Sequence, residues 1–226
     1  MGQPKRTRDL RQERIERLVK PRVRPTSMPM TRLPDWVIGD THFGHDNIIG
    51  HSNRPANHDE LMIANWKEVV KPVDSILHLG DVHFRQAGSE IVRRAHLGGH
   101  VYFLRGNHDR LGEVEALQGL GWKLVEPFYA QVGKWKVVFT HWPQEELEAL
   151  VINAHGHTHA LPEQSARHLS LCVERQGYRP QPLAKLLQER VRLLEDKEAL
   201  ADFERRRKIE WDAAMSARAV EDRLRR

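Results

Sequence analysis

The chain has 226 residues, enough for one domain with an extension or at most two small domains. Apolar residues make up 39% and charged residues 30%, as in soluble globular proteins, and no stretch approaches the roughly 18 apolar residues of a membrane span. The one cysteine, Cys172, excludes an internal disulfide framework and a cysteine-based zinc site. The Arg-rich N-terminus has no apolar segment behind it and is no secretory signal, so we expect a cytoplasmic protein without a membrane partner.

Charge is unevenly distributed along the chain, whose net charge is +5. Residues 1–32 contain ten Lys or Arg against three Asp or Glu, and residues 174–226 are also net basic. Residues 33–173 are net acidic and rich in histidine. An acidic, His-rich middle suits divalent cations, and basic ends suit a polyanion. The basic ends can equally be a solvated arm and a solvated helix face.

The pattern predicts three segments: a basic arm and linker, interrupted by Pro21, Pro25 and Pro29, at 1–32, a domain at 33–182, and a helical C-terminal extension of one or two helices at 183–226. Apolar runs predict strands at residues 36–40, 75–81, 100–107, 122–125, 128–132, 135–141, 150–157 and 168–174, with a hairpin turn at Gly133. Helices are expected from the N-cap Asn57 to about Val70, at 89–96 and 113–120, and from Pro143 onward. This alternation is typical of a layered α/β (α+β) domain.

Five of the apolar runs end on residues that can bind metal. They end in Asp40-Thr41-His42, Gly80-Asp81, Gly106-Asn107-His108-Asp109, Thr140-His141 and Gly156-His157-Thr158-His159. The carboxyl ends of strands line one rim of a layered α/β domain, so we expect these side chains to meet there. In Asp-x-His and His-x-His, both side chains point the same way from an extended chain and can reach one ion or two adjacent ions.

Ligands from five segments are more than one ion needs, which predicts a pair of divalent ions roughly 3.5–4 Å apart. Carboxylate, imidazole and amide ligands together suit borderline divalent metals. We expect Mn²⁺ first, ahead of Fe, Co, Ni or Zn.

The ordered set of five blocks resembles the calcineurin-like metallophosphoesterase superfamily over residues 35–174. Three segments are similar to a subgroup of small bacterial and phage phosphoesterases. They are Asp40-Thr41-His42-Phe43-Gly44-His45-Asp46-Asn47-Ile48-Ile49, Asn53-Arg54-Pro55 and Gly177-Tyr178-Arg179-Pro180. The resemblance implies a metallophosphoesterase β-sandwich flanked by helices. The basic arm and the long C-terminal helix lie outside it.

The resemblance also implies a role for each residue of the blocks. The implied metal ligands are Asp40, His42 and His159 for one ion, Asn107, His141 and His157 for the other, and Asp81 as the bridge. His108 would contact the phosphate and protonate the leaving oxygen, with Asp109 orienting its ring. A hydroxide shared by both ions would attack phosphorus in line, which agrees with the general chemistry of paired cations and a positioned imidazole.

The remaining polar residues divide into possible substrate contacts and structural residues. The candidate substrate-binding residues are His45, Asn47, Arg54 and His83, and for Arg54 a capped turn is an equal alternative. His78 is expected to be a buried, hydrogen-bonded core histidine, His155 a supporting residue rather than a ligand, and Cys172 a small buried strand residue. Surface or helix-end positions are expected for His51, His58, His96, His100 and His168.

These features favour a dinuclear metal-dependent phosphoesterase, and most of all a phosphodiesterase acting on a nucleotide or nucleic acid, because the basic arm would attract phosphate backbones. One alternative is a phosphomonoesterase or phosphoprotein phosphatase with the same metals. Another is a nucleic-acid-binding protein with a structural metal site, against which the complete set of ligands with His108 and Asp109 argues. No feature of the sequence predicts an oligomeric state.

Overall fold

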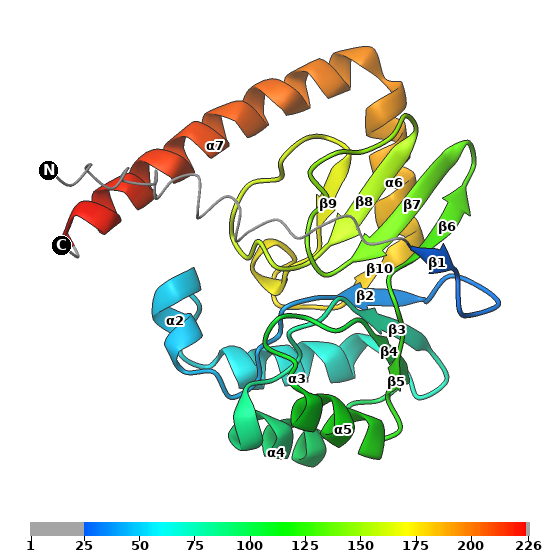
Figure 1. Cartoon of the computed structure of the whole chain (residues 1–226), viewed down its shortest axis with the longest axis vertical. Helices are drawn as coiled ribbons and strands as arrows, with labels where there is room; N and C mark the ends of the chain where they lie inside the picture. The colour runs from blue at the N-terminus through cyan, green and yellow to red at the C-terminus, as the bar shows by residue number, and fades with distance from the viewer. Residues whose placement is uncertain (1–24, 225–226) are drawn as a thin grey trace, which may run out of the picture.

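The computed structural model describes residues 25–224, with side chains up to residue 217. Two mixed five-stranded sheets form a sandwich with helices around it (Figure 1). The predicted α/β sandwich with flanking helices is therefore confirmed. What was expected of residues 1–24 of the basic arm lies outside the described residues.

The first sheet has the order β1-β6-β7-β8-β9. Its strands are β1 (Thr26–Ser27), β6 (Phe128–Val132), β7 (Trp135–Thr140), β8 (Val151–His155) and β9 (His168–Ser170). β6 and β7 form the predicted antiparallel hairpin, in which Val132 is opposite Trp135 and Gly133 has the positive φ of 59° that such a turn needs. The other pairs are parallel, and β1 pairs with β6, so residues 26 and 27 are part of the sheet rather than of a linker.

The second sheet has the order β10-β2-β3-β4-β5. Its strands are β10 (Gln181–Pro182), β2 (Trp36–Ile38), β3 (Ser75–His78), β4 (His100–Phe103) and β5 (Lys123–Leu124). All pairs are parallel except β10 with β2. β2, β3 and β4 end two to four residues before the predicted ends at 40, 81 and 107, so the metal-binding blocks occupy the loops that follow.

Alternation along the strands of the second sheet produces two separate apolar layers. Val37 and Leu77 belong to the core between the sheets, together with Phe128 and Phe139 of the first sheet. Ile38 and Ile76 point the other way and pack with side chains of the helices, among them Met62, Trp66 and Val92. A sheet that is apolar on both faces explains why its strands are continuous apolar runs in the sequence.

The helices α3 (His58–Val69), α4 (Arg85–Ala95) and α5 (Leu111–Gly119) cover the outer face of the second sheet (Figure 1). All three were predicted, although α4 begins four residues earlier than expected and the Asn57 side chain makes no capping hydrogen bond. The short α2 (Asn47–Ser52) was not predicted. The helix expected from Pro143 is wrong. There the chain is tied to its neighbours, since the Thr140 hydroxyl donates to the Trp142 carbonyl and the Gln144 amide donates to Asn153 Oδ1.

The C-terminal extension forms two helices, α6 (Leu183–Glu195) and α7 (Lys197–Leu224). Asp196 separates them and caps α7, because its Oδ1 accepts from the amides of residues 198 and 199. Leu183 and Leu187 are fully buried in the core, so α6 is physically part of the sandwich. The first half of α7 contacts the domain, since Glu204 accepts from the Ala166 amide, and the far end of the helix extends away from it (Figure 1). Over residues 25–224, no helix is long and apolar enough to cross a membrane.

Candidate metal centre

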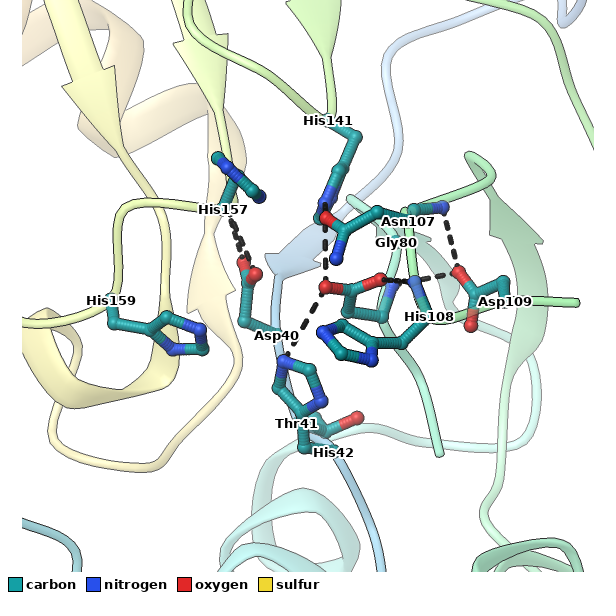
Figure 2. Close-up of polar contacts among 12 residues, drawn as sticks. Asp40, Thr41, His42, Gly80, Asn107, His108, Asp109, His141, His157 and His159 are labelled. Atoms are coloured by element: carbon teal, nitrogen blue, oxygen red, sulfur yellow. Dashed lines mark hydrogen bonds and ion pairs between the residues drawn. The ribbon is translucent and has the colours of Figure 1, made fainter. Parts of the chain in front are cut away.

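The loops that follow β2, β3, β4, β7 and β8 bring the predicted metal ligands together (Figure 2). Two groups form, Asp40 with His42 and His159, and Asp81 with His141 and His157. Within each group, one donor atom from every residue lies within 4.8 Å of the others. These are the groups expected for two neighbouring ions.

Asp81 lies between the two groups. Its Oδ2 is 3.4 Å from Nε2 of His42 in one group and 3.4 Å from Nε2 of His141 in the other. Its Oδ1 accepts a hydrogen bond of 2.8 Å from the backbone amide of His108. Asn107 places its Oδ1 3.0 Å from His141 Nε2, on the side of the second group. The position of Asp81 suits a carboxylate shared by two ions.

The histidine rings are prepared for metal by their burial and by their hydrogen bonds. His141 Nδ1 lies 2.8 Å from the Leu79 carbonyl, which can only accept, so in the neutral ring, the form that binds metal, Nδ1 carries the proton and Nε2 has the lone pair. Both ring nitrogens of His42 and Nε2 of His157 are buried without a hydrogen-bond partner among the described residues. Buried polar atoms normally have partners, so these orphaned nitrogens fit metal ligands.

Acidic and basic side chains of the two groups alter one another's pKa values. Burial raises the pKa of Asp40 to about 6. Burial disfavours the charge on His141, but the carboxylate of Asp81 outweighs it and raises the pKa of His141 to about 9. In return, the charge of His141 overcomes the burial of Asp81 and holds the pKa of that carboxyl well below its usual range. An imidazolium thus stands where a cation would supply positive charge, which again fits a metal centre.

Five of the predicted ligands have a backbone conformation that L-residues rarely adopt. Their φ angles are 58° for Asp40, 49° for His42, 55° for Asp81, 68° for His157 and 51° for His159. Each such residue costs roughly 1–3 kcal/mol and persists only where its surroundings impose it. Such strain collects at functional sites, and here it turns each strand end sharply toward the same point.

Two glycines make the close packing of these loops possible. A Cβ on Gly106 would collide with the carboxylate and amide of Asp81, and a Cβ on Gly156 would collide with the carboxylate of Asp40. The His157 amide donates to both oxygens of Asp40, at 2.8 and 3.0 Å, which links the two ligand groups (Figure 2). The glycines of the sequence blocks are therefore required by the site itself.

Residues 34–222 match the family model described as calcineurin-like phosphoesterase. The chain belongs to this family. The match extends well beyond residue 174, where the sequence resemblance was expected to end, and it includes α6 and most of α7. Both the superfamily and its sandwich fold, predicted from the five blocks, are confirmed.

Two further similarities concern proteins without a stated activity. The uncharacterized protein MJ1445 of Methanocaldococcus jannaschii is 29% identical over 160 residues, which cover 64% of this chain and 84% of that protein. The crystal structure of the protein of unknown function AQ665 from Aquifex aeolicus superposes with a TM-score of 0.55 at 22% identity, over 68% of this chain and 97% of that one. The second similarity is one of fold.

His108 of this phosphoesterase lies beside the predicted ligands, and its side chain is partly exposed. Its ring is 5.1 Å from the ring of His42, edge to face, and 5.9 Å from the rings of both His45 and Phe84. The backbone amide, rather than the ring, contacts Asp81. The ring is thus partly open to solvent beside the predicted ligands, while the backbone is held by the carboxylate of Asp81.

The expectation that Asp109 orients the His108 ring is wrong. Asp109 is buried, and its Oδ2 accepts from the amides of Asp81 and Gly106, each at 2.7 Å, while its Oδ1 accepts from the Val82 amide at 3.0 Å. These three amides occupy both carboxylate oxygens. Asp109 therefore holds the loops after β3 and β4 against each other (Figure 2).

The candidate substrate contacts differ in position. His45 is half-buried and stacks on Phe84 with 4.0 Å between ring centroids, and its ring is 5.5 Å from that of His42, so it lines the centre. Asn47 is exposed at the start of α2, and its contact with substrate stays a prediction. For His83 the expectation is wrong, because the residue is fully buried and its backbone is bridged to that of Phe43.

Arg54 is not a phosphate contact either. Its side chain is fully buried, and the guanidinium donates to the backbone carbonyls of Asp40 and Thr41 at 2.6 and 2.7 Å. It also pairs with Glu174 at 2.7 Å, and Glu174 accepts from His159 Nδ1 at 2.9 Å. Burial disfavours the charge of Glu174, but the hydrogen bond from His159 and the charges of His159 and Arg54 together outweigh it, and the pKa of that carboxyl is lowered. Sequence reasoning missed Glu174, whose only signal is its place in the last apolar run.

The other histidines follow the expectations in part. His78 and His155 are buried and hydrogen-bonded, and Cys172 is buried just after β9. His51, His96 and His100 are exposed, as expected. His58 is buried but is the first residue of α3, which is a helix-end position as expected, whereas His168 is buried in β9 and the expectation for it is wrong. For His168 the cause is a pair of hydrogen bonds, to the Gln144 carbonyl and to the Ser165 hydroxyl, that hold its ring inside the protein.

Proposed function

We propose that the chain is a dinuclear metal-dependent phosphodiesterase that acts on a nucleotide or nucleic acid. The observation that carries this proposal is the position of Asp81, with one oxygen 3.4 Å from a histidine nitrogen of each ligand group. A carboxylate at this position suits a shared ligand of two ions. Membership in the phosphoesterase family supplies the reaction class.

The proposal divides the ligands as the sequence resemblance implies. Asp40, His42 and His159 would hold one ion, Asn107, His141 and His157 would hold the other, and Asp81 would contact both. When bound, two divalent ions such as Mn²⁺ neutralise charge on the phosphoryl oxygens and lower the pKa of a coordinated water. The buried nitrogens of His42 and His157 that lack a hydrogen-bond partner in the described part of the chain favour this assignment.

His108 is the proposed proton donor to the leaving oxygen. Its ring is partly exposed and lies next to His42, so it can reach a phosphoester bound at the centre. The aromatic ring of Phe84 and the imidazole of His45 flank it and restrict its orientation. Donation of a proton from a positioned imidazole contributes roughly 10²–10⁴ to the rate of such a reaction.

The choice of substrate class rests on charge. The net charge is +5, and Lys and Arg are concentrated in residues 1–32 and in the C-terminal extension, whereas the centre itself is acidic. Basic segments outside the active site attract a phosphate backbone without taking part in the chemistry. A phosphodiester within a longer anionic chain suits this division better than a small monoester.

The test compares hydrolysis of several phosphoesters by chelator-treated protein before and after Mn²⁺ is restored. The panel contains a generic diester, a generic monoester, cyclic nucleotides, and single- and double-stranded nucleic acid. We expect hydrolysis only with metal, faster for diesters than for the monoester, and with the highest kcat/KM on nucleic acid or nucleotides. Preference for the monoester would overturn the diesterase proposal.

A further inference from the structure

Glu174 lies in the short 3-10 helix Val173–Arg175, which follows β9, far from the sequence blocks that supply the ligands. Its side chain is only 3% exposed. One oxygen, Oε1, accepts hydrogen bonds from His159 Nδ1 at 2.9 Å, from Arg54 Nε at 2.9 Å and from Arg54 Nη2 at 2.7 Å. A single buried carboxylate atom thus joins an ion ligand to a buried arginine.

The bond to His159 decides which ring nitrogen can bind metal. A carboxylate only accepts, so the proton of the neutral ring must be on Nδ1, and Nε2 keeps its lone pair. A carboxylate behind a metal-binding histidine fixes the tautomer and the ring orientation and makes the ring more basic. Glu174 stands in this relation to His159.

Through its hydrogen bonds to Arg54, Glu174 also helps to position a second proposed ligand, Asp40. The guanidinium donates to the backbone carbonyls of Asp40 and Thr41, at 2.6 and 2.7 Å. Asp40 has the left-handed φ of 58°, and these bonds help to hold it there. Glu174 therefore connects two of the proposed ligands of one ion, the ring of His159 directly and the backbone of Asp40 through Arg54.

The second ligand group is held by other contacts. His141 is oriented by the Leu79 carbonyl, and the loop of Asp81 is held by Asp109. The link between the groups, from the His157 amide to the Asp40 carboxylate, does not involve Glu174. Different carboxylates thus position the ligands of the two proposed ions, Glu174 for one group and Asp109 for the other.

We propose that Glu174, braced by Arg54, is a positioning residue that sets the affinity of one ion only, the ion of Asp40, His42 and His159. This inference rests on the proposed dinuclear centre. Loss of a carboxylate behind a metal-binding histidine typically lowers metal affinity 10- to 100-fold. The other ion, held by His141 and His157, keeps its affinity.

The chain offers a matched control in Glu163. This carboxylate is also buried and paired with an arginine, Arg190, at 2.7 Å, but its further partner is the amide of Ser170 rather than a ligand. Glu163→Gln and Glu174→Gln therefore both leave a buried guanidinium without its counter-charge. Only Glu174→Gln also removes the negative charge that accepts the hydrogen bond from the proposed ligand His159.

The test is titration of metal-free full-length protein with Mn²⁺ alone, with free ion measured and with the electron paramagnetic resonance spectrum recorded at each addition. Wild type and Glu163→Gln are expected to bind two ions and to show a spin-coupled pair. Glu174→Gln is expected to bind one ion normally and the other about 10-fold more weakly, and Glu174→Ala about 100-fold more weakly. At intermediate Mn²⁺, both variants should show isolated ions.

The variants separate positioning from stability. If Glu174→Ala does not fold, Glu174→Gln is compared with Glu163→Gln, because Gln keeps an acceptor for His159 and the two variants remove equivalent charges. Normal binding of both ions by folded Glu174→Gln, or equal weakening of both, would overturn the inference. In the double variant His159→Ala/Glu174→Gln, the further loss of affinity should be smaller than the loss caused by Glu174→Gln alone, because only the contact through Arg54 and Asp40 remains to be lost, and fully additive losses would contradict a shared action.

Failure of the inference can be told from failure of the proposed function. Wild type that binds fewer than two Mn²⁺ ions at saturation removes the dinuclear centre and this inference with it. Wild type that binds two ions, together with a Glu174→Gln variant that binds them equally well, removes the inference alone.

Discussion

The ring of His78 in β3 lies 2.9 Å from the hydroxyl of Thr41, the residue between two of the proposed ligands. The Gly80 amide donates to His78 Nδ1 at 3.2 Å, so Nε2 carries the proton and donates to Thr41 Oγ1. That hydroxyl donates in turn to the Val82 carbonyl at 2.6 Å. This chain of hydrogen bonds joins the loops after β2 and β3, and it requires a neutral imidazole.

The first prediction concerns stability against pH. Burial lowers the pKa of His78 to about 3, against roughly 6.5 in an unfolded chain. Stability from this neutral ring is therefore fully present above pH 6.5 and is lost as the pH falls from 6.5 toward 3, at up to about 1.4 kcal/mol per pH unit. Denaturant unfolding of metal-free protein at several pH values measures this slope.

His78→Gln should lower the free energy of unfolding at pH 7 and make it depend less on pH between 6.5 and 4. His96→Gln provides the control, because His96 is exposed, and it should keep the wild-type slope. An unchanged slope in His78→Gln would show that the ring is not held neutral by its surroundings.

The second prediction concerns the bridging carboxylate. Asp81→Ala should abolish binding of both ions, because one oxygen of Asp81 faces a ligand of each group. Asn107→Ala should weaken mainly one ion, because its amide oxygen lies beside His141 alone. Metal analysis after equilibrium dialysis against Mn²⁺ measures both, with the surface variant Asp202→Asn as control. Two ions retained by Asp81→Ala would contradict the bridging role.

The third prediction concerns His108. His108→Ala should keep both ions, since the backbone amide and not the ring contacts Asp81. Turnover should fall roughly 10²- to 10⁴-fold on esters with poor leaving groups. The loss should shrink as the leaving group becomes more acidic, because such groups depart without a proton. An equal loss on every ester in a series of leaving groups would exclude His108 as the acid.

The fourth prediction concerns the basic arm. Removal of residues 1–24 takes away nine Lys or Arg and leaves β1 in place. Affinity for long nucleic acid should fall and its dependence on salt should become weaker, because fewer counterions are released. Hydrolysis of a small diester should stay nearly unchanged, because every proposed catalytic residue lies later in the chain. If affinity and salt dependence match those of the full chain, the arm is not a polyanion contact.

Removal of residues 1–32 serves as the comparison for this truncation. It also deletes the pairing of β1 with β6 and the packing of Met28 and Met30 on the core. We therefore expect a lower melting temperature than for the shorter truncation. An equal melting temperature would mean that residues 25–32 contribute nothing to the fold.

That the predicted ligands come together could be predicted, because each of their sequence blocks follows an apolar strand and a local pattern already places it at the rim of the sheet. The roles of Arg54 and Asp109 could not. Arg54 is braced by Glu174, 120 positions later in the chain, and Asp109 accepts amides 27 and 28 positions before it. Partners at such separations are determined by the packing of the loops, which local sequence does not describe.

Helices and strands show the same limit. The apolar runs at β2, β3 and β4 identified the strands, but each strand ends before its run does. After β2 and β3 the predicted ligands Asp40, His42 and Asp81 adopt left-handed backbone conformations, which a run of apolar letters cannot indicate. Pro143 suits a helix start by residue type alone. There the side chain of Asn153, in a strand later in the sequence, binds the Gln144 amide instead.

The most direct test of the dinuclear phosphoesterase is a titration of chelator-treated protein with Mn²⁺, in which bound ions per chain and hydrolysis of a small phosphodiester are measured in the same samples. Asp81 faces both ligand groups, so the account predicts that two ions bind and that hydrolysis appears only as the second site fills. Full activity with a single bound ion, or no hydrolysis with two, would contradict it.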